Sequence, residues 1–232
     1  MNIFYTPNLS FDNHLSEEES RHAVKVLRLT VGDEILQADG MGSFYRTKIV
    51  DAHPKCCQTE VIEVIQQKPK RDFRIHIAVA PTKNMDRFEW FAEKATEIGI
   101  DVITPLRCRF SERKELKNER VERVLIAAMK QSQKAYIPKL NPICDFSTFV
   151  HEDTSEQKFI AHCYDDYEKS PLKNACVRNS NATILIGPEG DFSREEVEEA
   201  LSRGFQSVSL GDSRLRTETA ALVACHTIHL LQ

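Results

Sequence analysis

Two polar loops that contain glycine carry the side chains best suited to chemistry in this 232-residue sequence. The first loop, residues 187–193, has the sequence Gly-Pro-Glu-Gly-Asp-Phe-Ser, and the second loop, residues 211–219, has Gly-Asp-Ser-Arg-Leu-Arg-Thr-Glu-Thr. Glycine lets backbone approach a ligand closely, and Asp191 tolerates a left-handed conformation better than most residues do. Neither loop matches GxGxxG or GxxxxGK[ST], so neither a dinucleotide site nor a P-loop is indicated. Taken alone, each loop is also explained as a plain turn leading into a helix cap.

Each loop follows a predicted buried strand, and this position favours a ligand site over a plain turn. The strands are Thr183–Ile186 and Gln206–Leu210, and ligands of open parallel sheets bind beyond the carboxyl ends of the strands. Ser193 and Glu196 have the spacing of a capping box, which predicts a helix after the first loop. Two such loops at one edge of a sheet favour a ligand site.

Strands and helices alternate from residue 73 onward. Further strands are predicted at Arg74–Ala80, Val102–Pro105 and Phe159–His162, and helices at Met85–Ile98, Arg120–Ala135, Arg194–Arg203 and Glu218–Leu231. This alternation predicts an α/β fold with a largely parallel sheet covered on both faces. Pattern alone favours a doubly wound arrangement, because knotted chains are very rare.

The first 70 residues have a different pattern, typical of a small β-rich module. Strands are predicted at Asp33–Asp39, Phe44–Ala52 and Cys57–Gln66, with a hairpin turn at Asp39–Gly42. Ser16 is placed to cap one helix whose apolar stripe is formed by Ala23, Val24 and Leu27. The polar stretch Gln66–Arg71 predicts a linker, so we expect two domains, 1–70 and 73–232.

Composition narrows the class of protein. The net charge is −4, but residues 73–140 carry +5, against −2 before them and −7 after them. A polyanion site is therefore expected in the middle third, although a solvated charged face would give the same pattern.

The seven cysteines include no CxxC pair, so we expect reduced thiols and no metal site. No apolar run reaches the roughly 18 residues of a membrane span, and the N-terminus does not resemble a signal peptide, so a cytoplasmic protein is expected.

Several motifs in a fixed order identify a resemblance that covers nearly the whole chain. They are Arg21–Arg28, Lys94–Gly99, Ile103–Pro105, Ile184–Gly190, and Ser209–Gly211 followed by Leu215–Ala220. Together they resemble the RsmE family, SPOUT-class methyltransferases that modify N3 of a uridine in small-subunit (16S) ribosomal RNA. Three places depart from the family pattern. Asp191 replaces a glycine, Ser213 replaces a basic residue, and Lys130–Lys134 replaces a Glu-Gln-x-Gly-Arg-like stretch.

The resemblance implies a specific fold and specific partners. Residues 73–232 would form a C-terminal SPOUT trefoil-knot methyltransferase domain, and residues 1–70 an N-terminal PUA-like RNA-binding β-barrel. The cofactor would be S-adenosylmethionine, and the substrate 16S ribosomal RNA, within the small ribosomal subunit. The protein would be a homodimer, with the apolar stripe of the last helix contributing to the interface. The stripe is explained equally well as part of the chain's own core.

The resemblance also implies roles for individual residues. The cofactor would be held by residues of the two loops: Ile186, Gly187, Pro188, Gly190, Leu210, Gly211, Leu215 and Thr217. Arg216 would stabilise negative charge on the uracil oxygens, and Glu189 would act as a base. Alternatively, Arg216 forms an ion pair with Glu218 or Glu189, and Glu189 caps amides of its own loop. The RNA contacts would be His22, Arg28, Arg109 and Arg113.

Two other classes of protein remain as alternatives. One is a Rossmann-type methyltransferase or dehydrogenase, which the missing glycine fingerprint disfavours. The other is a PUA-like RNA-binding protein without catalytic activity, which the intact Gly-Pro-Glu-Gly and Leu-Arg-Thr-Glu-Thr stretches disfavour.

Overall fold

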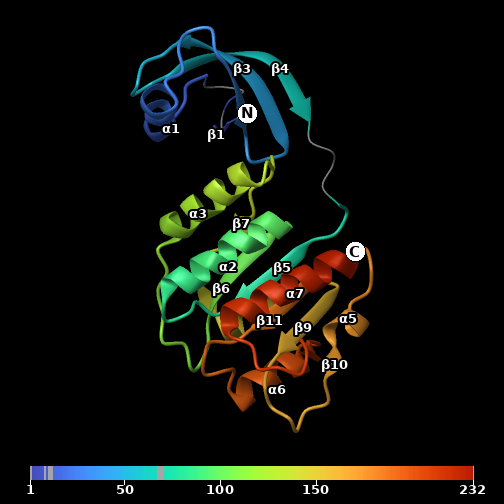
Figure 1. Ribbon diagram of the computed structural model, residues 1–232. Coiled ribbons are helices and arrows are strands. Elements are labelled where there is room, and N and C mark those ends of the chain that lie inside the picture. Colours follow the sequence, from blue (N-terminus) through green and yellow to red (C-terminus); the bar gives the residue numbers. More distant parts are fainter. Residues whose placement is uncertain (1, 8, 10–12, 67–70, 232) are drawn as a thin grey trace. The chain divides into compact units, whose positions relative to one another are not determined.

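The computed structural model describes residues 2–7, 9, 13–66 and 71–231 (Figure 1). Contacts divide the chain into two compact units, Met1–Lys70 with Ile126–Ile137, and Arg71–Leu125 with Pro138–Gln232. Most of the predicted linker, residues 67–70, lies outside the described residues. The segment Ile126–Ile137 packs with the first unit, although the predicted boundary placed it in the second domain. In the described part of the chain, no helix has both the length and the apolar character that a bilayer span requires.

The first unit is built on a four-stranded sheet with the order β1-β2-β3-β4. Its strands are β1 (Ile3–Tyr5), β2 (Glu34–Ala38), β3 (Ser43–Asp51) and β4 (Gln58–Gln66). β1 pairs with β2 in parallel, and the other pairs are antiparallel. The three predicted strands and the hairpin turn are confirmed. The turn is closed by Asp39, whose Oδ1 accepts from the amides of Met41 (2.7 Å) and Ser43 (3.0 Å).

The predicted helix of the first unit is also present, in two parts. Helix α1 (Glu17–Arg21) begins where Ser16 accepts from the amide of Glu19, and it continues as a π-helical turn, His22–Val26. Ala23 is fully buried in the core of this unit. Glu19 accepts from Lys130 Nζ at 2.6 Å, so the first residue of the departing Lys130–Lys134 stretch forms an ion pair inside the unit.

The second unit contains the predicted parallel sheet. Five strands make up its centre: β12 (Gln206–Ser209), β9 (Gln157–Ala161), β11 (Ala182–Ile186), β5 (Ile75–Val79) and β6 (Val102–Arg107), in that order across the sheet. The short strands β10 (Ser170–Pro171), β7 (Lys139–Leu140) and β8 (Cys144–Asp145) extend it at the edges, and every pair is parallel. The five central strands were predicted. The two-residue strands were not, because they are too short to show any periodicity.

Helices cover both faces of this sheet, as predicted. Helices α2 (Met85–Ile98) and α7 (Thr217–Leu231) pack side by side against one face (Figure 1). Helices α4 (Phe146–Glu152) and α6 (Arg194–Ser202) pack on the other face, around a core that includes Phe149, Ile160, Leu185 and Phe192. The remaining helices are α3 (Asn118–Gln131) and α5 (Leu172–Ala175).

The apolar stripe of α7 is mostly buried within the chain. Ala221, Cys225 and Ile228 are fully buried within the chain, and Leu222 and Leu231 are half-buried. The alternative that the stripe belongs to the chain's own core is therefore confirmed for these three residues. Their burial in the single chain leaves them no surface to offer a partner.

A histidine in the sheet makes folding sensitive to acid. His76 on β5 is largely buried, with Nε2 2.7 Å from Thr104 Oγ1 and Nδ1 3.3 Å from Thr183 Oγ1. Burial lowers its pKa from 6.5 to about 4, with Asp153 acting in the opposite direction and Lys139 adding to the decrease. The folded protein therefore holds this ring neutral at pH values at which the unfolded chain would protonate it.

We predict that His76 destabilises the fold as the pH falls from 6.5 towards 4. The unfolded state takes up a proton in this window and the folded state does not, so the loss is at most about 3 kcal/mol. His76→Gln replaces the imidazole with a side-chain amide, which can still form hydrogen bonds with threonine hydroxyls but does not titrate. Urea unfolding at pH 7 and pH 5 should show a smaller drop in unfolding free energy for the variant than for the wild type. An equal drop in both proteins would contradict this assignment.

Candidate active site

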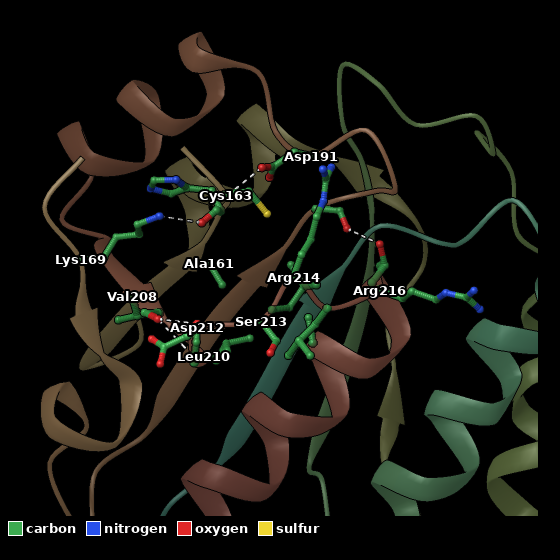
Figure 2. A pocket seen from close by; sticks show the side chains of 18 of the residues that line it. Ala161, Cys163, Lys169, Asp191, Val208, Leu210, Asp212, Ser213, Arg214 and Arg216 are labelled. Carbon is green, nitrogen blue, oxygen red and sulfur yellow. Dashed lines mark hydrogen bonds between the residues drawn. The ribbon is translucent and has the colours of Figure 1, made fainter. Parts of the chain in front are cut away.

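Three loops meet at the carboxyl edge of the central strands and enclose a cavity of about 580 Å³ (Figure 2). Because β12, β9 and β11 are neighbours, the loops that follow them are neighbours too. The floor of the cavity is apolar and is formed by Ala161, Ile186, Val208, Leu210, Leu215 and Ala220. Its walls carry acidic and basic side chains from all three loops: Asp165, Lys169, Glu189, Asp191, Asp212, Arg214 and Arg216.

The structure brings the two predicted loops together. The lining of this cavity includes seven of the eight residues expected to hold a cofactor, namely Ile186, Gly187, Pro188, Leu210, Gly211, Leu215 and Thr217. Glu189 and Arg216 line it as well. Gly190 is the exception and packs against Phe110 instead. Thr217 also joins the two loops, since its buried hydroxyl donates to the carbonyl of Gly187 at 3.0 Å.

The third loop, residues 162–169 after β9, was not predicted as part of the site. It contributes His162, Cys163, Asp165 and Lys169 to the cavity. It contains no glycine and matches no motif that the sequence analysis used. Its role follows from the strand order, which places β9 between the two strands that carry the predicted loops.

Asp191 connects the first loop to the third. Its backbone has φ 67°, which confirms the left-handed conformation that its residue type allows. Its Oδ2 accepts from the amide of Cys163 at 2.8 Å, and its Oδ1 from the amide of Phe192 at 2.8 Å. Glycine would adopt the same backbone but could not form either bond. The departure from the family pattern at this position therefore adds a link between two walls of the cavity.

The glycines of the first loop are required by contacts within the protein. A Cβ at Gly187 would lie 3.1 Å from the amide nitrogen of Phe192, and one at Gly190 would lie 3.1 Å from the Cβ of Phe110. Both glycines were expected to let a ligand approach, whereas here Gly187 lets the loop fold tightly on itself and Gly190 lets it pack against Phe110. Gly211 in the second loop differs, because it has φ 129° and open space where a side chain would be.

Glu189 braces a neighbouring loop. Its Oε1 accepts from the backbone amide of Lys83 at 2.9 Å, and Lys83 lies in the loop after β5. The alternative prediction, that Glu189 caps amides of its own loop, is corrected, because the amide that it binds belongs to Lys83. A carboxylate can accept several hydrogen bonds, so this contact leaves a role as base open.

Arg216 is exposed at the start of α7. Among the described residues it forms neither of the ion pairs considered from the sequence, and Glu218 instead lies 3.8 Å from Arg87 of α2. Figure 2 shows its side chain directed away from the other labelled side chains, towards α2, whereas Arg214 extends towards Asp191. The two arginines of the second loop therefore face different sides of the site.

Burial controls protonation in the third loop. Burial and then the nearby Lys169 lower the pKa of His162, and its Nε2 lies 2.9 Å from Ser207 Oγ. Its Nδ1 is buried and has no hydrogen-bond partner in the described part of the chain. Burial and then the Asp191 carboxylate raise the pKa of the Cys163 thiol. This wall therefore presents a neutral imidazole and a neutral thiol at pH 7.

The residues expected to contact RNA lie outside the cavity. His22 and Arg28 are exposed in the first unit, and Arg28 has φ 57°. Arg109 is exposed after β6. Arg113 uses its guanidinium within the protein, donating to the carbonyls of Thr82 (3.3 Å) and Lys83 (2.8 Å). Within residues 2–7, 9, 13–66 and 71–231, no group of three or more His, Cys, Asp or Glu side chains could hold a metal ion.

Comparison with known proteins gives matches along the chain. A family model described as an RNA methyltransferase domain matches residues 69–229, and one described as an RNA methyltransferase PUA domain matches residues 15–62. The ribosomal RNA small subunit methyltransferase E of Rickettsia conorii is 30% identical over 94% of this chain and 89% of its own length.

Two solved structures are similar over the full length. One, described as a "probable rRNA-methyltransferase" from Porphyromonas gingivalis, is 42% identical with a TM-score of 0.94, and the match covers 100% of this chain and 98% of that chain. The other is a ribosomal RNA small subunit methyltransferase E from Neisseria gonorrhoeae bound to S-adenosyl methionine. It is 26% identical with a TM-score of 0.86, and covers 100% of this chain and 98% of that chain.

We predict that Asp191 holds the third loop in place. Both Asp191→Ala and Asp191→Gly remove the two side-chain hydrogen bonds. Alanine is strained in the left-handed backbone conformation at this position, whereas glycine is not. Asp191→Gly should therefore be more stable than Asp191→Ala by about 1 kcal/mol in urea unfolding. In both variants the amide of Cys163 should exchange hydrogen faster than in the wild type. Unchanged exchange at Cys163 in Asp191→Gly would show that the carboxylate does not hold this loop.

Proposed function

Because this chain belongs to the ribosomal RNA small subunit methyltransferase E family, we propose that it uses S-adenosylmethionine to methylate N3 of a specific uridine in 16S ribosomal RNA. The observation that carries this proposal is the cavity at the ends of β12, β9 and β11, lined by the two loops that define the resemblance. Matches to both the methyltransferase and the PUA models favour an enzyme over the non-catalytic RNA-binding alternative. A Rossmann-type enzyme is disfavoured because its glycine fingerprint is missing.

The cavity has the chemistry that S-adenosylmethionine requires. The cofactor supplies an electrophilic methyl group on a positively charged sulfonium. The apolar floor suits an adenine ring, and the carboxylates of Asp165, Asp191 and Asp212 complement positive charge. The buried Nδ1 of His162 has no partner among residues 2–7, 9, 13–66 and 71–231, so a polar group of a ligand would satisfy it. Backbone groups of Ile186, Gly187, Leu210, Gly211 and Leu215 would hold the cofactor.

Arg216 is proposed to stabilise the reacting base. Uracil N3 becomes nucleophilic only when its proton leaves, and the resulting negative charge spreads onto the carbonyl oxygens. A guanidinium beside one of these oxygens stabilises that state more than the neutral base, and this difference increases the rate. Arg216 lines the cavity at the side that faces α2. Glu189 would accept the N3 proton, while its bond to Lys83 fixes its position.

RNA binding and assembly complete the proposal. We infer a PUA-like barrel in residues 1–70, a trefoil-knotted domain in residues 73–232, and RNA contacts at His22, Arg28, Arg109 and Arg113. The protein would bind its substrate RNA in the cytoplasm, as part of the small ribosomal subunit. The two family-model matches and the parallel strand order support the domains. A crystal structure that traces the chain through α7 tests the knot.

We also propose a homodimer, on the ground of the family resemblance. Leu230 on α7 is 68% exposed and Leu222 is half-buried, so this helix still offers apolar surface to a partner. Light scattering at micromolar concentration should give twice the chain mass of 26.6 kDa. A monomer mass would rule out the homodimer.

We predict that the wild-type protein methylates small ribosomal subunits from cells that lack it and that Arg216→Ala loses most of this activity. Removal of one donor that stabilises developing charge costs about 10²–10³ in rate. Cofactor affinity should change little, because backbone groups hold the cofactor in this mechanism. Arg214→Ala is the matched control, since it removes the other arginine of the same loop. Single-turnover transfer of labelled methyl measures the rate, and calorimetry measures cofactor binding.

Two outcomes of this assay would contradict the proposal. No transfer by the wild-type protein, with cofactor bound, would refute the function. Near-normal transfer by Arg216→Ala would show that the arginine is not part of the chemistry, and would leave Glu189 as the candidate.

A further inference from the structure

A tight turn after β6 holds an aromatic ring partly in solvent. The turn spans Cys108–Ser111, with the amide of Ser111 donating to the carbonyl of Cys108 (3.1 Å) and the amide of Cys108 to Ser111 Oγ (2.9 Å). The amide of Arg109 donates to Glu196 Oε1 at 2.8 Å, and Glu196 belongs to the capping box of α6. Phe110 lies at the tip of this turn and is 49% exposed. The protein therefore fixes the backbone of a residue whose ring it does not bury.

This turn lies directly on the first loop of the active site. A Cβ at Gly190 would come within 3.1 Å of the Cβ of Phe110 and 3.7 Å of its Cγ. The neighbours of Gly190 in sequence, Glu189 and Asp191, both line the cavity. Single exposed apolar residues are common on protein surfaces and need no explanation. Phe110 differs because hydrogen bonds hold both ends of its turn and because it packs against the first loop at Gly190, between the cavity-lining residues Glu189 and Asp191.

Hydrogen bonds join the loops on the same side of the site, which also carries the basic side chains of Arg109 and Arg113. Arg113 donates to two carbonyls of the loop after β5, and the amide of Lys83 in that loop donates to Glu189. The loops after β5, β6 and β11 are therefore linked to one another. In the strand order, β5 and β6 lie on the opposite side of β11 from β9 and β12. On its β5–β6 side the first loop therefore borders a turn that carries the aromatic ring of Phe110 and the exposed basic side chain of Arg109.

We propose that Phe110 is the surface on which the uracil to be methylated stacks after it leaves the RNA helix. This inference rests on the proposed function and adds a substrate-binding residue to it. Extraction of a base loses its stacking on neighbouring bases. An aromatic side chain recovers part of that loss by stacking on the extracted base, and it does so most effectively when its position is already fixed. Arg109, beside Phe110 in the turn, would contact the flanking phosphates.

Kinetics of matched variants separate stacking from simple apolar contact. Phe110→Leu keeps the apolar character and removes the ring, whereas Phe110→Tyr keeps the ring. With small ribosomal subunits as substrate, Phe110→Leu should lower kcat/KM about 10- to 100-fold, and Phe110→Tyr should stay within a few-fold of the wild type. Calorimetry should give unchanged cofactor affinity in both variants, which excludes a disturbed cavity. Wild-type kcat/KM in Phe110→Leu would overturn the proposal.

A fluorescence measurement tests whether the base that stacks at position 110 is the target uracil. Trp90 is the single tryptophan of the sequence, so Trp90→Phe combined with Phe110→Trp places one reporter at the turn. An RNA fragment containing the target uridine should quench this tryptophan, and the same fragment with an abasic site at that nucleotide should not. Equal quenching by both fragments, or none by either when both are bound to the protein, would show that the target base does not stack at position 110. Failure of the wild-type protein to methylate would instead refute the proposed function itself.

Discussion

The in-register pairing of three parallel strands is the constraint on which the rest of the site depends. Ala161 at the end of β9 pairs with Ile186 of β11 on one side and with Val208 of β12 on the other. These three residues form part of the cavity floor, and the loops that follow them form its walls. Side chains alternate between the faces of a sheet, so a shift of one residue in any of these strands would remove its contribution to the floor. The five residues of β11 are all buried, which ties the register to core packing.

A small set of hydrogen bonds then fixes the loops relative to one another. Asp191 joins the first loop to the third, Thr217 joins the first loop to the second, and Glu189 joins the first loop to the loop after β5. Each bond contributes only about 0.5–1.5 kcal/mol to stability. Their value for catalysis is positional, because a methyl donor and an acceptor nitrogen react efficiently only when the protein holds them in line. The first loop takes part in all three connections, which is consistent with its tight, glycine-dependent fold.

Local sequence determined most of the fold but little of the site's detail. The bounds of Met85–Ile98 could be predicted to the residue, because Asn84 caps its start and Gly99, in a left-handed conformation, ends it. The five central strands were recognisable as apolar runs, whereas β1 and the two-residue strands were too short. The third loop, the Lys83 partner of Glu189 and the contact of Phe110 with Gly190 depend on which strands are neighbours. Strand order is a property of the whole fold, and no local pattern carries it. For the same reason, the packing of Ile126–Ile137 with the first unit could not be foreseen.

The central claim, that this edge of the sheet methylates N3 of a uridine in 16S ribosomal RNA, is tested most directly in cells. Ribosomal RNA from cells that lack the protein should be digested and its modified nucleotides mapped by mass spectrometry, next to RNA from the parent strain. We predict the loss of one N3-methyluridine from 16S ribosomal RNA and its return when the wild-type protein is expressed again. An unchanged set of methylated nucleotides, in cells shown to lack the protein, would contradict the claim.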